Sequence, residues 1–233
     1  MADKVKLGVT FFDDCFGGVC SGCQVLCHGR SGSGKSIFAC HFLNQALRDG
    51  DTALLLTDGR AGDTITVAES FGMPFSKAAA DKQLTLLEYA SFMQDQDARA
   101  NPMLPPQAFM DLQAVIERQS VRRLVFDTVL PWVDIHPVTR IAEHVYSFTH
   151  ALERLGVTSL LTLTTSVSDP SFTLKNRLEG DCPVAIHLDY SQGAHRVAKV
   201  TKYLGDPRAL PAPMPFVIVP GTGIVSEAPP ALP

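Results

Sequence analysis

Short apolar runs alternate along this chain with segments whose apolar residues recur every three or four positions. The runs before residue 29 and over 52–57 are strand-like, and residues 37–47 between them have the spacing of an amphipathic helix. The same alternation continues over 83–89, 109–116, 124–126, 141–155 and 157–163. Strands that alternate with helices predict an α/β fold with a mostly parallel sheet flanked by helices.

The pattern changes toward both ends of the chain. Turn residues rather than helices separate the last strand-like runs, which cover 184–190, 194–204, 216–219 and 221–225. These runs predict an antiparallel extension at the C-terminal end of the sheet. Near the N-terminus, the apolar residues of 8–16 precede Gly17-Gly18 and predict a short helix packed on the edge of the sheet.

Two polar segments interrupt the alternation. Residues 91–106 contain Asn-Pro and Pro-Pro pairs and are expected to form an exposed loop or insertion. Residues 166–182 are expected to form a mobile loop with little core. The chain length suits one domain. We therefore predict a single domain over 1–226 and a flexible proline-rich tail over 227–233.

The clearest chemical signal lies between β-like and helix-like segments, from Gly29 to Ser36. Its sequence, Gly-Arg-Ser-Gly-Ser-Gly-Lys-Ser, fits the pattern G-x-x-x-x-G-K-[ST]. The glycines permit a tight turn whose N–H groups face one concavity, where they bind nucleotide phosphates. Lys35 supplies a positive charge, Ser36 offers a hydroxyl ligand to Mg²⁺, and the following helix directs its positive end at the phosphates. The predicted phosphate-binding residues are Gly29, Arg30, Ser31, Gly32, Ser33, Gly34, Lys35 and Ser36.

A second nucleotide signal is the apolar run that ends in Asp127. A carboxylate at the end of a buried strand is typical of a Walker B segment, where it orients Mg²⁺ at the carboxyl edge of the sheet. Thr164 and Thr165 end the next strand, where a hydroxyl could sense the γ-phosphate. A β-branched residue that simply suits a strand end explains them equally well.

Composition narrows the class of protein. A 233-residue chain with 45% hydrophobic and 19% charged residues is typical of a folded globular protein. Its formal net charge of −4 gives no overall basic field, so charge does not suggest a nucleic-acid partner. No apolar run is long enough to span a bilayer and no signal peptide opens the sequence. We therefore expect a cytoplasmic protein without a membrane partner.

The cysteines gather near the N-terminus. Cys15, Cys20 and Cys23 have a spacing superficially like that of an iron–sulfur loop. Cys27 and Cys40 flank the phosphate-binding loop at positions where cysteine commonly serves as a small buried hydrophobe. With a single C-x-x-C pair, reduced thiols are the favoured interpretation, a redox-sensitive Cys20/Cys23 pair the next, and a metal site the least supported.

The order of these elements resembles the KaiC-like branch of the RecA superfamily of P-loop ATPases over residues 7–226. The resemblance rests on Gly29–Ser36, Asp127, Lys202 with Gly205, and Pro215-Phe216. It implies ATP and Mg²⁺ as ligands, with Ser36 and Asp127 at the metal. It also implies a homo-oligomeric ring, often a hexamer in this family, with ATP between neighbouring subunits. In such a ring, Lys202 would face a neighbour's γ-phosphate.

Two departures from the family pattern concern hydrolysis. Where the family carries a Glu-Glu pair, this chain has Asp58-Gly59, and the shorter Asp58 side chain would serve less well as the base that activates water. Where the family has an arginine two residues after the interfacial lysine, this chain has Leu204. An arginine in this role can contribute ~10³ to 10⁵ in rate. The residues expected to bind the nucleotide are all present. The predicted catalytic residues are Lys35 and Asp58, and this set is weakened by the short side chain of Asp58 and by the missing arginine.

These observations favour a regulatory or assembly protein in which ATP·Mg²⁺ stabilises an oligomer or a conformation that binds a protein partner, and is hydrolysed slowly if at all. The alternative is an active RecA-type ATPase that acts on DNA in recombination or repair. In that case 166–180 would face the DNA, but it offers only Lys175 and Arg177 as cations. A kinase that phosphorylates its own Ser168, Ser171 or Thr173 is a further alternative, which rests on the family alone.

Overall fold

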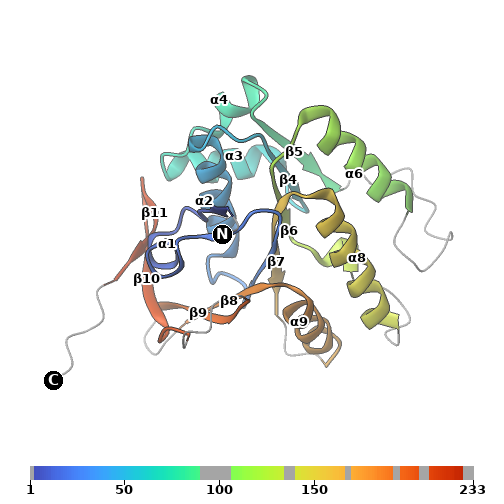
Figure 1. The fold of residues 1–233 in the computed structure, drawn as a ribbon. Coiled ribbons are helices and arrows are strands. Elements are labelled where there is room, and N and C mark those ends of the chain that lie inside the picture. The colour runs from blue at the N-terminus through green and yellow to red at the C-terminus, as the bar shows by residue number, and fades with distance from the viewer. Residues whose placement is uncertain are drawn as a thin grey trace.

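A central mixed sheet organises the computed structural model, which describes residues 3–89, 106–133, 140–165, 169–190, 195–204 and 210–227. In this part of the chain the sheet has nine strands in the order β11-β10-β9-β8-β3-β7-β6-β4-β5 (Figure 1). The strands from β8 to β5 run parallel, and β9, β10 and β11 follow in antiparallel pairs. The predicted α/β class and its antiparallel C-terminal extension are thus confirmed.

The strands have the following bounds: β3 Gln24–Gly29, β4 Ala53–Thr57, β5 Leu84–Glu88, β6 Arg123–Asp127, β7 Thr158–Thr164, β8 Val184–Tyr190, β9 Arg196–Tyr203, β10 Met214–Val219 and β11 Gly223–Ser226. A separate small sheet pairs β1 (Lys4–Val5) with β2 (Val19–Cys20). The helices are α1 Thr10–Phe16, α2 Lys35–Arg48, α3 Ala61–Ser70, α4 Phe75–Ala80, α6 Pro106–Gln119, α7 Leu130–Val133, α8 Ile141–Leu155 and α9 Asp169–Asp181.

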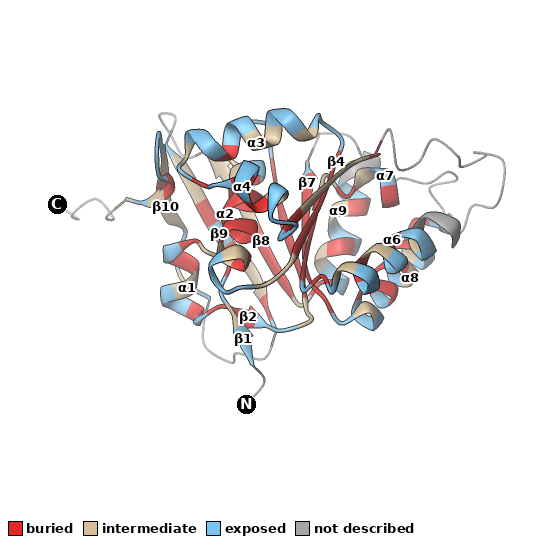
Figure 2. Ribbon diagram, turned by 90° about the horizontal axis from the view of Figure 1, so that it is seen from above, coloured by how far each residue is buried: buried red, intermediate tan, exposed pale blue. Residues whose placement is uncertain are grey.

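The central strands are apolar at successive positions because helices cover both faces of the sheet. Helices α1 to α4 lie on one face, and α6 to α9 lie on the other (Figure 2). Side chains alternate along β4, so that Leu55 joins the core under α2, while Leu54 and Leu56 join the core under α6 and α8. Burial on both faces explains the continuous apolar runs in the sequence.

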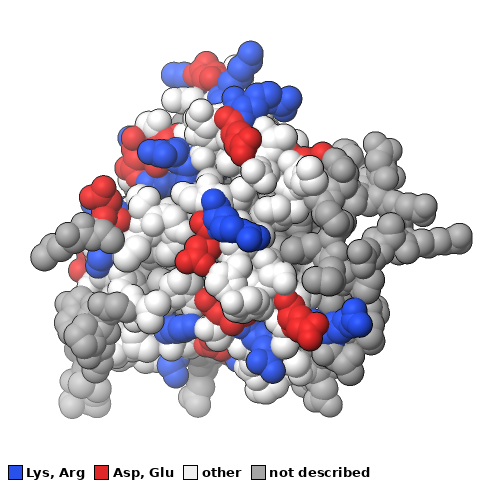
Figure 3. Space-filling view, turned by 45° about the vertical axis from the view of Figure 1, so that its right-hand side comes forward, with Lys and Arg blue, Asp and Glu red and all other residues white. Residues whose placement is uncertain are grey.

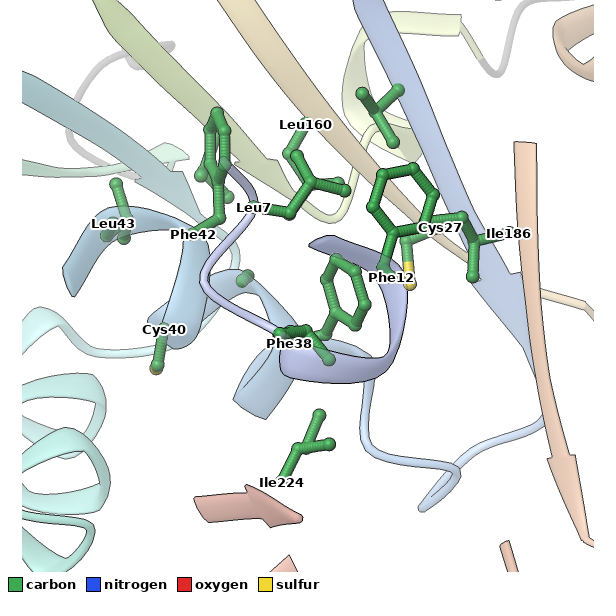
Figure 4. Close-up of a cluster of buried hydrophobic side chains, with 14 of the residues drawn as sticks. Leu7, Phe12, Cys27, Phe38, Cys40, Phe42, Leu43, Leu160, Ile186 and Ile224 are labelled. Atoms are coloured by element: carbon green, nitrogen blue, oxygen red, sulfur yellow. The ribbon is translucent and has the colours of Figure 1, made fainter. Parts of the chain in front are cut away.

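Helix α2 fills the middle of one core. Phe38 and Phe42 point from it toward the sheet, where they meet Leu7 and Leu160 (Figure 4). Phe12 of α1 joins the same cluster, and its side chain is fully buried. The N-terminal helix therefore closes this core at the antiparallel end of the sheet, in agreement with the predicted short helix over 8–16.

The segment 166–182 differs from its prediction. Instead of a loop with little core, its described part forms α9, which lies on the same face of the sheet as α8. Leu174, Leu178 and Cys182 follow one another at intervals of one helical turn, and all three are buried in the second core. The prediction was wrong because this narrow apolar stripe is surrounded by polar residues. Most of the predicted polar insertion, residues 91–105, lies outside the described residues.

Among the described residues, no helix combines the length and apolar character needed to cross a membrane.

Candidate nucleotide-binding site

The phosphate-binding loop joins the end of β3 to the start of α2. Strand β3 runs through the middle of the sheet to Gly29, and Gly34 adopts φ +107° as the N-cap of α2. A Cβ atom on Gly29 would lie 1.9 Å from the carbonyl oxygen of Leu188, so a larger residue cannot occupy this position without displacing β8. Sequence and packing therefore impose the same tight turn at the N-terminus of α2, where helix N–H groups favour an anion.

Lys35 is held inside this turn. The residue is 7% exposed, and its Nζ donates to the carbonyl oxygens of Gly29 at 3.1 Å and Arg30 at 2.8 Å. Burial lowers the pKa of the Lys35 ammonium, while the nearby Cys27 and Asp127 oppose this shift. Within the described residues Lys35 forms no ion pair with a carboxylate. Its charge is thus only partly compensated by the protein.

Asp127 ends β6 beside the loop, as the sequence predicts. Thr162 of the adjacent strand β7 donates its hydroxyl to the Oδ1 atom of Asp127 at 2.5 Å. The hydroxyl of Thr128 in turn donates to the carbonyl oxygen of Thr162 at 2.9 Å. This network fixes one carboxylate oxygen of Asp127, because its donor Thr162 lies on the buried strand β7.

A cleft of about 290 Å³ opens between the loop and the ends of β4, β6 and β7. Its walls are formed by Ser31, Gly32, Gly34, Lys35, Ser36, Ile37, Asp58, Asp127, Thr128, Thr162 and Thr164. The cleft therefore brings together the lysine, the predicted metal ligands and the predicted base. A volume of this order is at the small end of the range for ligand sites in proteins.

Asp58 reaches the cleft from the end of β4. Its N–H donates to the carbonyl oxygen of Asp127 at 3.1 Å, which ties the two strand ends together. Burial raises the pKa of the Asp58 carboxyl group, and the negative charge of Asp127 raises it further. A raised pKa makes a carboxylate a stronger base, which suits the role predicted for Asp58.

The remaining predicted residues divide between the cleft and other places. Thr164 lines the cleft, whereas Thr165 uses its N–H to hold the carbonyl oxygen of Gly29 at 3.0 Å. Ser33 is fully buried and is not among the residues of the cleft wall. Arg30 turns aside to Asp189, to which its Nε donates at 2.7 Å. The guanidinium of Arg30 is therefore paired with a carboxylate on β8, and Arg30 is not among the residues of the cleft wall.

Lys202 lies far from this chain's own loop. It pairs with Ala185 near the start of β8, whereas Gly29 pairs with Leu188 near the end of that strand. Its Nζ donates to the carbonyl oxygen of Glu179 at 3.2 Å and to that of Gly180, at the C-terminal end of α9. The structure does not bring Lys202 into the cleft that contains Lys35.

Sequence reasoning missed three residues that support the site. Thr162 and Thr128 hold the Asp127 network, and Tyr190 donates its hydroxyl to the carbonyl oxygen of Gly32 at 2.6 Å. A threonine two positions before the end of a strand that neighbours Asp127 was the available signal for Thr162. Tyr190 gave no signal, because its contact depends on the pairing of β8 with β3.

Basic and acidic side chains are interspersed on the molecular face seen in Figure 3. Lys175, a cation of the predicted DNA-facing segment, forms an ion pair with Glu179 at 2.9 Å on α9. The charge of Lys175 is therefore compensated, and the described part of this segment forms a helix rather than a loop.

Comparison with known proteins agrees with this geometry. The circadian clock oscillator protein KaiC of Parasynechococcus marenigrum strain WH8102 is 25% identical over 203 residues, which cover 76% of this chain and 38% of that protein. The KaiC protein of Acaryochloris marina is 27% identical over 203 residues, and the match covers 37% of its length. This chain thus matches less than half the length of these curated relatives.

A solved structure and a family model extend the comparison. The crystal structure of a KaiC-like protein from the hyperthermophilic archaeon Pyrococcus horikoshii OT3 superposes with a TM-score of 0.79 and 23% identity, covering 98% of this chain and 100% of that one. That likeness shows the shared fold. The family model described as the KaiC ATPase matches residues 5–228, almost the whole chain. This chain belongs to the KaiC family of ATPases.

Proposed function

We propose that this protein binds ATP·Mg²⁺ in the cleft beside Lys35 and uses the bound nucleotide to control its assembly, with slow hydrolysis. The observation that carries the proposal is that Lys35, Ser36 and Asp127 line one cleft. The loop N–H groups and Lys35 would hold the β- and γ-phosphates, and Ser36 and Asp127 would hold Mg²⁺. Bound Mg²⁺ would supply positive charge that neutralises the phosphates.

Slow hydrolysis follows from the two departures from the family pattern. Asp58 occupies the wall of the cleft and would orient the attacking water, but its side chain is one methylene shorter than glutamate. Leu204 occupies the position of the interfacial arginine, and its side chain is 65% exposed. A ring of this chain would therefore lack one cation that stabilises the transition state.

The place of Lys202 supports an assembly with nucleotide between subunits. Lys202 and Leu204 lie near the start of β8, whereas this chain's own loop follows Gly29 near the end of β8, so they would approach a nucleotide only in a neighbouring subunit. A homo-oligomeric ring, such as a hexamer, would provide this neighbour. Bound ATP would then link subunits, and its loss would weaken the ring.

Light scattering and turnover measured on the same sample test this proposal. With ATP and Mg²⁺ the purified chain should form an oligomer, and the turnover number should stay below about 1 s⁻¹, the low end of typical enzymes. Asp127→Asn should prevent the Mg²⁺-dependent assembly. Turnover of many ATP molecules per second, or an oligomeric state that ignores nucleotide, would contradict the proposal.

Two substitutions test the cause of slow hydrolysis. Asp58→Glu restores the length of the family's base, and Leu204→Arg restores the interfacial cation. We expect each to raise turnover, with little change in ATP affinity, because neither adds a phosphate ligand in the free chain. Val67→Arg is a matched control, since it also adds a cation at an exposed apolar residue but lies on α3. It should leave turnover unchanged.

A further inference from the structure

A second groove lies on the same face of the sheet as α2, outside the nucleotide cleft. Two adjoining cavities of about 370 and 360 Å³ share Asn44, Arg48 and Gly72 in their walls. One extends along α4 past Lys77, and the other extends past Thr222 in the turn between β10 and β11. Because their walls share three residues, the cavities form one continuous groove beside the C-terminal half of α2.

Asn44 is the most informative residue of this groove. It is 7% exposed and lines both cavities, yet its side-chain amide has no hydrogen-bond partner among the described residues. An amide offers two donors and an acceptor, and those of Asn44 line the open groove, where a ligand can pair with them. The neighbouring His41 is satisfied by contrast, because it contacts the carbonyl oxygen of Gly8 at 3.1 Å and accepts the N–H of Ile224 at 2.8 Å. The groove thus contains one mostly buried side chain whose amide has no protein partner among the described residues and is available to a ligand.

Two cations stand beside this amide. Arg48 follows Asn44 by one helical turn, and Lys77 projects from α4 into the wall of the same cavity. Neither forms an ion pair among the described residues. Asp81 is the acidic residue that lines the groove, at its α4 end. The middle of the groove is therefore positive and suited to an anion.

The walls of the groove are fixed by the packing of two turns. The N–H of Gly221 donates to the carbonyl oxygen of Ser70 at 2.8 Å, which joins the β10–β11 turn to the end of α3. Gly72 adopts φ +75°, and a Cβ atom there would lie 3.0 Å from the carbonyl oxygen of Gly221. Since this contact leaves little room for movement, the groove is present before a ligand arrives, which lowers the entropic cost of binding.

From these observations we propose that the groove binds a small oxyanion ligand, a phosphate or a carboxylate compound, that also offers a hydrogen-bonding group to Asn44. Arg48 and Lys77 would bind the oxyanion, with the planar guanidinium of Arg48 suited to a bidentate contact. The amide of Asn44 would pair with a neutral polar group such as a nucleobase edge or an amide. Cavity volumes of this size fall within the range of small-molecule sites.

Nuclear magnetic resonance of the ¹⁵N-labelled full chain tests this site directly. The side-chain amide signal of Asn44 is assigned by its loss in Asn44→Leu and is followed during titration with inorganic pyrophosphate, citrate or AMP. We expect at least one of these probes to shift the Asn44 signal in a saturable manner. A stronger response to AMP than to citrate would assign a phosphate ligand, and the reverse order would assign a carboxylate ligand. Signals of Gly29 to Ser36 report separately on the phosphate loop.

Variants distinguish the groove from nonspecific binding of anions. Arg48→Gln and Lys77→Gln should each weaken the effective probe by roughly tenfold, whereas Lys199→Gln, which removes an exposed lysine on β9, should not. In Asn44→Leu the backbone signals of Arg48 and Lys77 should no longer shift with the probe, while the chain stays folded because an apolar group of similar size replaces the amide. An Asn44 signal that no probe moves, or a shift that survives both cation variants, would overturn the proposal.

Discussion

Lys35 and Arg123 are both buried cations, but the protein treats their charges differently. Arg123 is 1% exposed at the start of β6, where its guanidinium contacts Asp49, donates to Asp51 at 3.0 Å and donates to the carbonyl oxygen of Lys6 at 2.7 Å. Within the described part of the chain, Lys35 has only the carbonyl oxygens of Gly29 and Arg30 as hydrogen-bond partners. A buried cation that is paired with carboxylates of its own chain stabilises the fold, whereas a buried cation without a carboxylate partner is available to bind an anionic ligand.

The largest effect is expected when Lys35, the cation without a carboxylate partner among the described residues, is removed. Lys35→Ala should weaken ATP binding on the order of 10²- to 10³-fold, because several charge-assisted contacts to phosphate are lost. The free energy of unfolding without nucleotide should stay equal or rise, since a partly compensated buried charge disappears. Titration calorimetry with ATP·Mg²⁺ and urea unfolding measure the two quantities. Unchanged ATP affinity would show that the charge of Lys35 does not contribute to nucleotide binding.

Removal of Arg123 should have the opposite effect, lowering stability without changing ATP affinity. Arg123→Met should lower the free energy of unfolding by about 2–3 kcal/mol, because Asp49 and Asp51 lose their shared partner. Since both acids are partly exposed, water limits the cost. ATP affinity of the folded fraction should not change. Arg122→Met, which alters the neighbouring exposed arginine, is the matched control and should leave stability near the starting value.

Acidification should destabilise the fold through buried histidines. Burial, together with the nearby His187, lowers the pKa of His28 from an ordinary 6.5 to about 4. Between pH 6.5 and 4, the His28 imidazole is protonated in the unfolded chain but neutral in the folded chain. The free energy of unfolding therefore decreases as the pH falls from 6.5 toward 4. This one histidine should account for roughly 1–3 kcal/mol between these limits.

Urea unfolding at neutral pH and at about pH 4.5 measures this loss. His28→Phe keeps an aromatic ring against His187, whose ring centroid lies 4.8 Å from that of His28, and should flatten the pH dependence. His150→Gln changes an exposed histidine and should not. An equally steep dependence in His28→Phe would show that other groups dominate.

The smallest effect is expected at the residue that positions Asp127. Thr162→Val removes the hydroxyl that donates to this carboxylate and should raise the Mg²⁺ concentration needed for ATP binding by roughly threefold to tenfold. Thr162→Ser keeps the hydroxyl and should largely restore the original requirement. Equal Mg²⁺ dependence in both variants would mean that Asp127 is oriented without Thr162.

The sequence allowed much of the fold to be predicted because most elements carry their own pattern. The apolar run of β4 and the helical spacing of α8 are long enough to identify each element. Helix α9 escaped prediction because its apolar stripe is narrow. It becomes a stable helix only where Leu174 and Leu178 find the core beside α8 and β3, a contact that no local pattern reveals.

The residues of the site also divide into those that a local motif identifies and those that other strands bring to it. Gly29 to Ser36 could be identified because all its chemistry lies in one continuous segment. Thr162 and Tyr190 could not be identified because each reaches the site from another strand. The groove beside Asn44 likewise joins α2 to α4 and to the β10–β11 turn, segments that lie far apart in the sequence.

By itself, the sequence determined that a phosphate-binding loop follows an apolar strand and begins a helix, and that an acidic residue ends a later strand. Only the tertiary structure decided that β7 lies between β3 and β6, so that Thr162 meets Asp127 beside Lys35. The physical reason is that a local pattern sets which residues form a strand, whereas the order of strands depends on long-range packing of both faces of the sheet.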